Sequence, residues 1–204
     1  MRGRFITLEG GEAAGKSTQA ALLEKTLREA GTHVLRTREP GGAPGSEALR
    51  GLLLTPGIDW SPMAETLLHM AARAEHVAKT IRPALDRGEW VICDRFSDST
   101  LAYQGYGQGT DRAAIAQLTS LIGLVPDLTL VLTVSPETSE ARLTHRGIAA
   151  DRYERLPLDF HAKVAAGFAE IAANNPDRCV VIDANGTREQ THAAIMVAVK
   201  ARRT

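Results

Sequence analysis

Residues 10–17 read Gly-Gly-Glu-Ala-Ala-Gly-Lys-Ser, a G-x-x-x-x-G-K-[ST] pattern typical of phosphate-binding loops. The pattern follows an apolar run at residues 5–8 and precedes a helical pattern. In such a loop, backbone N–H groups surround a phosphate, Lys16 neutralises its charge and the Ser17 hydroxyl ligates Mg²⁺. The alternative is a turn whose glycines only permit a tight bend. The strand and helix context favours a nucleotide-phosphate site.

Asp94 and Arg95 form a second chemical pair, directly after the apolar run 90–93. Ligands of open α/β sheets bind at the carboxyl ends of strands, so both side chains are predicted to lie near the phosphate site. Asp94 could hold Mg²⁺ through water, and Arg95 could bind an anionic oxygen. The alternative is a structural ion pair, or an aspartate that caps a helix.

Two further arginines could bind an anionic substrate. Arg38 directly follows the second predicted strand, and the Glu-Pro-Gly-Gly turn after it would place it as a bidentate phosphate clamp. Arg73 lies on a long predicted helix, where a solvated charge is the common alternative. Residues 99–105 add hydroxyl, phenol and amide groups near the same face.

Four arginines surround a segment in which glycines and charges interrupt the helical periodicity, and they are Arg142, Arg146, Arg152 and Arg155. Phosphoryl transfer depends mostly on positioning and charge stabilisation, so mobile arginines that close over a triphosphate would have a clear task. A solvated helix face is the alternative for any one of them.

The elements that must position these residues alternate between strand and helix. Near-continuous apolar runs predict strands at residues 5–8, 33–37, 90–93, 128–134 and 179–182. Helical patterns fill residues 16–30, 45–54, 63–87, 112–121, 136–146, 158–174 and 188–202. This alternation predicts a doubly wound α/β domain with helices on both faces of a parallel sheet. We expect one domain, residues 1–204, with a lid at about residues 142–155.

Composition excludes several other classes of protein. Lysine plus arginine and aspartate plus glutamate each total 24, so no global field attracts nucleic acid or a membrane. Cys93 and Cys179 fall in predicted buried strands, and we expect free thiols in a reducing compartment. The absence of a long apolar segment leads us to expect a soluble, cytoplasmic protein. Residues 39–45, 105–110 and 144–155 are predicted to be mobile surface segments.

Together these motifs resemble the thymidylate kinase family over essentially the whole chain. The matching segments are residues 10–17, 37–42, 71–73, 94–96, 99–105 and 151–154. The resemblance implies a fold of the P-loop NTPase type, Mg²⁺ as cofactor, and transfer of the γ-phosphoryl group of ATP to dTMP. It also implies a homodimer, through helices at residues 63–87 and 112–121.

The resemblance also assigns roles to individual residues. For ATP it implies Gly10, Gly11, Glu12, Ala13, Ala14, Gly15, Lys16, Ser17, Thr18 and Arg142. For dTMP it implies Glu9, Arg38, Pro40, His69, Arg73, Arg95, Ser99, Thr100, Tyr103 and Gln104. Metal ligation falls to Ser17 and Asp94, and the catalytic set is Lys16, Arg95, Asp94, Glu9, Arg146 and Arg152.

Two positions distinguish this chain within the family pattern. The variable loop positions 11–14 hold no basic residue, so the resemblance implies that lid arginines supply that charge. The candidates are Arg142, Arg146 and Arg152, of which we favour Arg146 or Arg152 as alternatives. His69 stands where a phenylalanine usually stacks on thymine. An imidazole offers less apolar area, and its protonation would change the contact at lower pH.

Two other functions compete with this interpretation. One is a P-loop kinase for another nucleoside monophosphate. The other is a nucleotide-operated switch that binds partners, but the Asn/Thr-Lys-x-Asp stretch of guanine-specific switches does not occur in this sequence. The acceptor-side arginines would also have no task in a switch.

Overall fold

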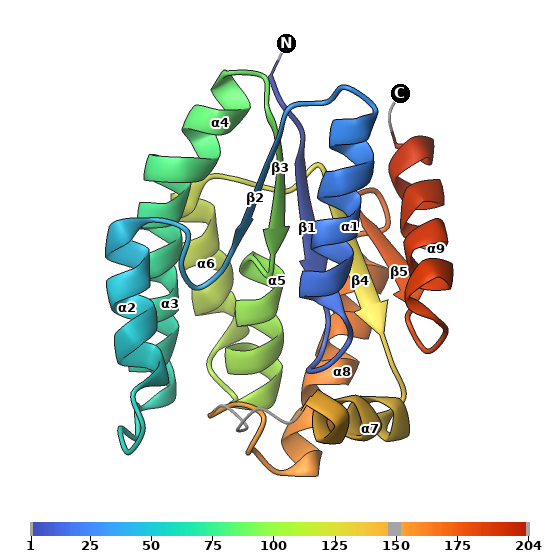
Figure 1. Ribbon diagram of the computed structural model, residues 1–204. Coiled ribbons are helices and arrows are strands. Elements are labelled where there is room, and N and C mark those ends of the chain that lie inside the picture. Colours follow the sequence, from blue (N-terminus) through green and yellow to red (C-terminus); the bar gives the residue numbers. More distant parts are fainter. Residues whose placement is uncertain (1, 147–151, 203–204) are drawn as a thin grey trace.

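A parallel five-stranded sheet forms the centre of the computed structural model, which describes residues 2–146 and 152–202 (Figure 1). The strands are β1 (Phe5–Glu9), β2 (Val34–Arg38), β3 (Trp90–Asp94), β4 (Leu128–Thr133) and β5 (Cys179–Asp183). They lie in the order β2-β3-β1-β4-β5, and every hydrogen-bonded pair is parallel. The predicted sheet is confirmed, because each expected strand lies within one residue of the observed one.

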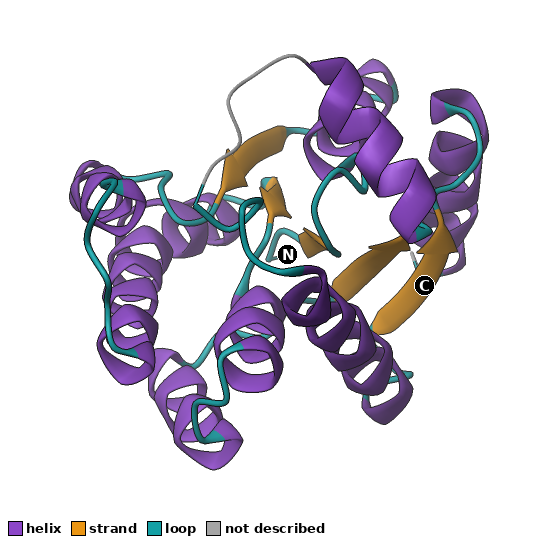
Figure 2. Cartoon of the chain, turned by 90° about the horizontal axis from the view of Figure 1, so that it is seen from below, coloured by secondary structure: helices purple, strands orange, loops and turns teal. Residues whose placement is uncertain are grey.

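Helices cover both faces of the sheet, as predicted (Figures 1 and 2). On one face lie α1 (Lys16–Glu29) and α9 (Arg188–Ala201), which pack against each other and on the sheet. On the opposite face lie α4 (Arg82–Asp86), α5 (Ser97–Thr100) with its continuation η2 (Leu101–Gly107), and α8 (Leu158–Asn174). Every residue of β1 is buried, as expected for a central strand with both faces covered.

The remaining helices lie at the edges of this sandwich. On the β2 side, α2 (Pro44–Leu54) packs on α3 (Pro62–His76), and α6 (Arg112–Ile122) packs on α3 and η2. The short α7 (Pro136–Arg146) lies near the carboxyl ends of the strands (Figure 1). Residues 147–151 of the predicted lid lie outside the described residues, as does the side chain of Arg146.

The helix predicted at residues 63–87 is present, but its turns are not uniform. After α3 the chain continues into η1 (Val77–Ile81), a π-helical segment with wider turns, and then into α4. Pro83 lies one turn further on and has no N–H to donate to the preceding turn, which is a common cause of such a widening.

Residues 97–107 form a helical segment that the sequence analysis missed, and the prediction of a mobile surface loop from residue 105 was wrong. Gly105 and Gly107 suggested a loop, but here they allow close packing. A Cβ atom on Gly107 would lie 2.4 Å from the ring of Phe160 on α8. Glycine is therefore required for the approach of α8 to η2, and the segment is held in the core.

The expected surface loop at residues 39–45 is also partly buried, since Glu39 and Ala43 are each 6% exposed. By contrast, the expectation for the cysteines is confirmed, because Cys93 and Cys179 are buried free thiols. Among the helices of the described ranges, none combines the length and the apolar character needed to cross a bilayer.

Candidate active site

Two adjoining pockets open at the carboxyl ends of β1, β2 and β3, where the strand register places Leu8 and Arg38 on either side of Asp94. The first, here called the inner pocket, is lined mainly by residues of α2, α3 and the α5–η2 segment and by the residues that directly follow β2 and β3. The second, the P-loop pocket, is lined by the glycine-rich loop, Asp94 and α7. Four residues line both pockets: Glu12, Glu39, Arg50 and Arg95.

The glycine-rich loop turns sharply between β1 and α1. Gly10 has a φ of 135°, and a Cβ there would lie 2.2 Å from the carbonyl oxygen of Leu132, so no other residue fits. Gly15 has a φ of 88° and leads directly into α1. The first N–H groups of α1 have no partner within the helix, and together with the helix dipole they favour an anion at this point.

The ammonium group of Lys16 bonds back to the backbone of the glycine-rich loop. Its Nζ donates to the carbonyl oxygens of Gly10 at 3.0 Å and Gly11 at 2.6 Å, and the residue is 7% exposed. Burial, together with the nearby Arg95 guanidinium, lowers the pKa of Lys16 to about 8. The ammonium group thus lies at the wall of the P-loop pocket, where it can move to a phosphate oxygen.

Ser17 and Asp94 place two oxygen atoms side by side at the mouth of the P-loop pocket. The Ser17 hydroxyl donates to Oδ2 of Asp94, and the contact is solvent-exposed. Hydroxyl and carboxylate oxygens are hard ligands of the kind that Mg²⁺ prefers. The residues present therefore fit a magnesium ion shared with a nucleotide phosphate.

Arg95 lies between the two pockets in a strained backbone conformation, with a φ of 67°. Its Nη2 donates to Oε1 of Glu12 at 2.7 Å, and its guanidinium lies 4.8 Å from the ring centre of Tyr103. Tyr103 donates its hydroxyl to the same oxygen of Glu12 at 2.6 Å. Although burial opposes it, the charges of Arg95 and Lys16 lower the pKa of Glu12 to about 2. An anionic ligand could replace this carboxylate on Arg95.

Arg73 is 3% exposed and is held by a buried network. Its Nε donates to Glu39 at 2.7 Å, and Nη2 donates to the carbonyl of Phe96 at 2.9 Å and to Thr100 at 3.0 Å. His76 contacts the other oxygen of Glu39 at 3.0 Å. The solvated alternative for Arg73 is thereby excluded, and Nη1, whose neighbour is the weak acceptor Sδ of Met70, can still donate into the pocket.

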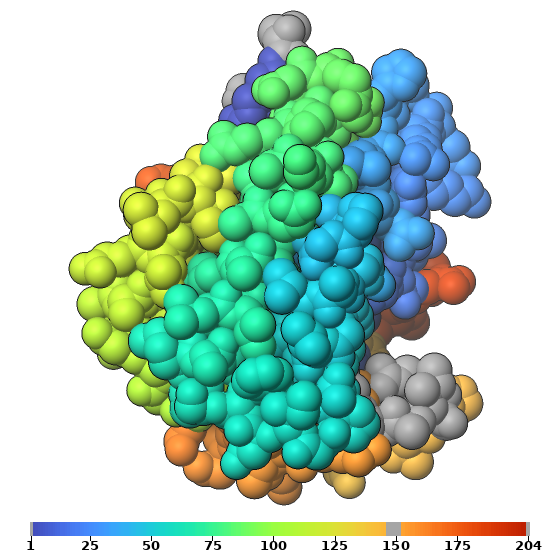
Figure 3. Space-filling model, turned by 90° about the vertical axis from the view of Figure 1, so that its left-hand side faces the viewer, coloured from blue at the N-terminus to red at the C-terminus, as the bar shows by residue number. Residues whose placement is uncertain are grey.

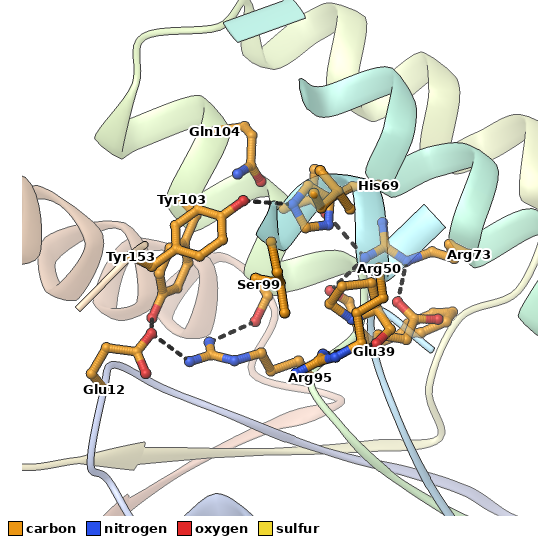
Figure 4. Close-up of a pocket in the computed structure, with 15 residues that line it drawn as sticks. Glu12, Glu39, Arg50, His69, Arg73, Arg95, Ser99, Tyr103, Gln104 and Tyr153 are labelled. Carbon is orange, nitrogen blue, oxygen red and sulfur yellow. Dashed lines mark hydrogen bonds and ion pairs between the residues drawn. The ribbon is translucent and has the colours of Figure 1, made fainter. Parts of the chain in front are cut away.

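His69 lies at the wall of the inner pocket, and Figure 4 shows it between Gln104 and Arg73. Its Nε2 is 2.9 Å from the hydroxyl of Tyr153. Because that hydroxyl donates its one proton to Glu65, the neutral His69 ring donates from Nε2–H to the Tyr153 oxygen. Burial and the neighbouring arginines lower the pKa of His69 to about 3. The expectation that protonation alters the contact at moderately low pH is therefore not supported.

Glu9 is fully buried at the end of β1, outside the lining of both pockets. Its carboxyl group accepts from the Ser99 hydroxyl at 2.5 Å and from the backbone N–H of Phe96 at 2.8 Å. Burial and the nearby Asp98 raise the pKa of Glu9 to about 7. In this structure Glu9 positions Ser99, which does line the inner pocket.

The other expected residues divide between the pockets as follows. The inner pocket has Pro40, His69, Arg73, Arg95, Ser99, Thr100, Tyr103 and Gln104. The P-loop pocket has Glu12, Ala13, Gly15, Lys16, Ser17, Thr18, Asp94 and Arg142. Arg38, expected on the acceptor side, lines the P-loop pocket and forms a bidentate ion pair with Glu47. Gly10, Gly11 and Ala14 shape the loop but line neither pocket.

The lid arginines point to different places. Arg142 of α7 donates to the carbonyl oxygen of Ala13 at 3.2 Å and therefore lies over the P-loop. Arg152 instead pairs with Glu65 of α3, with its Nη1 2.6 Å from Oε2. Of the two alternatives for transition-state charge, Arg152 is thus engaged on the acceptor side.

Sequence reasoning missed the contribution of α2. Arg50, Leu53 and Leu54 all line the inner pocket, and Nη1 of Arg50 donates to the carbonyl oxygen of Pro40 at 2.9 Å. Their spacing of three and four residues marks one face of a helix and could have grouped them. Nothing local in the sequence shows that this face turns toward the site.

Comparison with known proteins identifies the family. The family model described as thymidylate kinase matches residues 8–195. The chain is 52% identical to a thymidylate kinase of Gluconobacter oxydans over 202 residues, covering 97% of this chain and 94% of the relative. A thymidylate kinase of Caulobacter vibrioides is 50% identical, with 95% and 94% covered. The crystal structure of thymidylate kinase from Ehrlichia chaffeensis superposes with a TM-score of 0.80 at 37% identity, covering 98% of this chain and 99% of that one. The chain belongs to the thymidylate kinase family.

Proposed function

We propose that this protein transfers the γ-phosphoryl group of ATP to dTMP, giving ADP and dTDP. Family membership supports the reaction. The structural observation that supports this reaction for this chain is the pair of adjoining pockets, which share Arg95 and Glu12 in their lining. One pocket has the phosphate-binding loop, and the other is lined by Arg73, Gln104 and other groups that could bind a base. Two substrates could therefore meet with their phosphates at the shared wall.

In this proposal the P-loop pocket takes ATP. The N–H groups of the loop and of α1 would surround the β-phosphate, and Lys16 would leave the loop carbonyls to bind phosphate oxygens. Mg²⁺, held through Ser17 and Asp94, would neutralise charge on the phosphates when bound. Arg142, which already lies over the P-loop, is placed to add positive charge from the lid side.

The inner pocket would take the base and the phosphate of dTMP. Arg95 and Arg50 line both pockets, so either guanidinium can reach an acceptor phosphate at the shared wall. Arg73 presents a donor to the base edge, and Gln104 presents an amide. Thymine offers an acceptor, O4, beside a donor, N3–H, so a donor from Arg73 and an acceptor from Gln104 would complement it.

A coupled assay across nucleoside monophosphates tests the function. We expect the highest kcat/KM with dTMP, and phosphorylation only when ATP and Mg²⁺ are present. A clear preference for another monophosphate would favour the second kinase hypothesis. Hydrolysis of nucleotide that depends on a partner protein, without any phosphorylated acceptor, would favour the switch.

Replacing Arg73 with alanine is expected to weaken dTMP binding about 10- to 100-fold, because a charged hydrogen bond to the base is lost. It also leaves the buried Glu39 carboxylate without its main ionic partner, which should lower the free energy of unfolding by about 3–5 kcal/mol. Calorimetric titration with each nucleotide and denaturant unfolding measure the two effects.

The Arg73→Lys variant separates binding from stability. It keeps a positive charge beside Glu39 but loses the planar fork, so dTMP binding should still fall while stability is largely retained. If ATP affinity collapsed in both variants and dTMP affinity did not, the assignment of the two pockets would be wrong.

Replacing His69 with phenylalanine is expected to leave kcat unchanged and to leave or lower KM for dTMP, because a benzyl ring offers more apolar area for stacking. Tyr153 keeps a hydrogen bond to Glu65, so its hydroxyl is not left unpaired. The pKa of His69 is about 3, so wild type and variant should share one pH profile between pH 5 and 8. A large loss of kcat/KM would show that the imidazole has a role of its own.

We further propose that the protein forms a homodimer through α2, α3 and α6. Figure 3 shows that these helices share one face of the molecule. Their exposed apolar side chains include Leu52, Met63, Leu67 and Leu121, with Leu121 84% exposed. Sedimentation of wild type and of a Leu67→Glu variant should give a dimer and a monomer; a wild-type monomer at micromolar concentration would contradict the proposal.

A further inference from the structure

Glu65 of α3 is a buried carboxylate at which donors from two separate segments meet, the end of η2 and the segment that holds Tyr153. The residue has no exposed surface. Its Oε1 accepts from Nε2 of Gln104 at 2.9 Å, from Nε2 of Gln108 at 2.7 Å and from the Tyr153 hydroxyl at 2.9 Å. Burying a carboxylate costs free energy unless its oxygens are hydrogen-bonded or paired, and here the surrounding donors offset that cost.

We propose that Glu65 determines base specificity by fixing the orientation of the Gln104 amide. This inference rests on the proposed function, because it concerns the base of the acceptor nucleotide. A carboxylate only accepts hydrogen bonds, whereas the amide of Gln104 has a donor end and an acceptor end. Glu65 therefore binds the NH₂ end of Gln104 and turns the carbonyl end away from itself.

The free end of Gln104 faces the inner pocket, which this residue lines. Among the residues that the structure describes, none donates a hydrogen bond to its Oε1. A base that covers this carbonyl shields it from water, so the base must supply a donor in place of water. The N3–H group of thymine or uracil is such a donor.

Arg73 completes the pattern on the opposite side of His69 (Figure 4). Its guanidinium has only donors, and Nη1 can still donate into the pocket. The site thus presents a donor and an acceptor to two neighbouring positions of the base. Thymine matches with O4 and N3–H. Cytosine has N4–H₂ and an unprotonated N3 at these positions. Its N4–H₂ donor would face the Arg73 donor, and its N3 acceptor would face the Gln104 carbonyl oxygen.

The lid reinforces the orientation from outside. Arg152 pairs with Oε2 of Glu65, and Tyr153 bonds to Oε1, so two neighbouring residues of one segment occupy both oxygens of the carboxylate. This arrangement keeps Glu65 in place as an acceptor for Gln104. Glu65 is a positioning residue, since it acts on the base through Gln104.

The decisive comparison uses dTMP and 5-methyl-dCMP, which differ only at the base edge in question. In Glu65→Gln, the new amide can donate to Gln104 and so let its NH₂ end turn toward the base. We expect the ratio of kcat/KM for dTMP over 5-methyl-dCMP to fall at least tenfold. The dissociation constant of 5-methyl-dCMP divided by that of dTMP, measured by calorimetric titration without ATP, should fall with it. Any disturbance of the lid affects both nucleotides and cancels in these ratios.

Three further variants separate orientation from structure. Glu65→Asp remains a pure acceptor, so its ratio should stay within about threefold of wild type even where absolute rates fall. Gln108→Leu removes another donor to the same oxygen and should also leave the ratio unchanged. Gln104→Leu removes the oriented amide itself and should lower the ratio without altering Glu65, which keeps the test valid if Glu65→Gln folds poorly.

The proposal is overturned if Glu65→Gln and Glu65→Asp lower both activities equally with an unchanged ratio. It is also overturned if Gln104→Leu discriminates as well as wild type. These results would leave the proposed function intact, provided that wild type phosphorylates dTMP. A wild type that does not phosphorylate dTMP would instead refute the proposed function itself.

Discussion

Replacing Lys16 with methionine is expected to lower kcat/KM about a thousandfold. Methionine has a similar length and fits the buried site of Lys16, which is 7% exposed. The substitution removes the charge and the donors but little volume. The fold should therefore persist while the chemistry fails.

The reason lies in the position of the ammonium group. Nζ bonds to the carbonyl oxygens of Gly10 and Gly11, which hold it at the wall of the P-loop pocket. Burial makes the charge costly there, as its lowered pKa of about 8 reflects. A phosphate group would offer the charged partner that the carbonyl oxygens only partly replace. Binding and charge stabilisation in the transition state would then both depend on this one side chain.

Steady-state kinetics with both substrates varied, and nucleotide titration by calorimetry, measure this effect. Lys25→Met is a matched control, because Lys25 lies on the same helix with a side chain 71% exposed. Its loss should change neither rate nor stability by more than about 0.5 kcal/mol. Wild-type kinetics in Lys16→Met would mean that the glycine-rich loop is a structural turn, which is the alternative that the sequence left open.

The features that the sequence predicted are those encoded locally. The strands follow from continuous apolar runs, and their parallel order follows from the helices between them. The glycine-rich loop follows from spacing, because Gly10 and Gly15 supply backbone conformations that other residues rarely adopt. Asp94 and Arg95 lie where expected, since the end of a buried strand is a position that the sequence itself marks.

The features that escaped prediction depend on packing between distant elements. Glu12 belongs to the loop motif, yet its side chain binds Arg95 and Tyr103 on the acceptor side, and motif spacing does not encode this direction. Glu65 meets Gln104 and Tyr153 only because α3, η2 and the lid converge. Periodicity identifies Glu65 as one more polar residue on a helix, and only its complete burial shows that it has a role.

Replacing Arg95 with alanine is the second large change, expected to lower kcat/KM for dTMP about a thousandfold while KM for ATP changes less than about threefold. Arg95 lines both pockets, and its backbone is held at a φ of 67° to reach this position. Glu12 occupies its guanidinium at 2.7 Å in the structure described. The phosphate of dTMP would displace that carboxylate and take over the charge-assisted bonds.

Arg95→Lys tests whether geometry or charge matters, since lysine lacks the planar fork that can hold a phosphate and contact Ser99 together. We expect it to recover only a small part of the lost activity. Arg36→Ala is the control, because Arg36 forms an ion pair with Glu24 and its side chain is 45% exposed. Its loss should leave kinetics unchanged.

The pattern of the losses in Arg95→Ala distinguishes the two pockets. If the arginine serves the acceptor phosphate, saturating dTMP should restore part of the rate, and saturating ATP should restore none. The reverse pattern would place Arg95 on the donor phosphates, and Glu12 would then be a switch that releases it when ATP arrives. A Glu12→Gln variant settles this point, because weakening the ion pair should lower KM only for the nucleotide whose phosphate replaces the carboxylate.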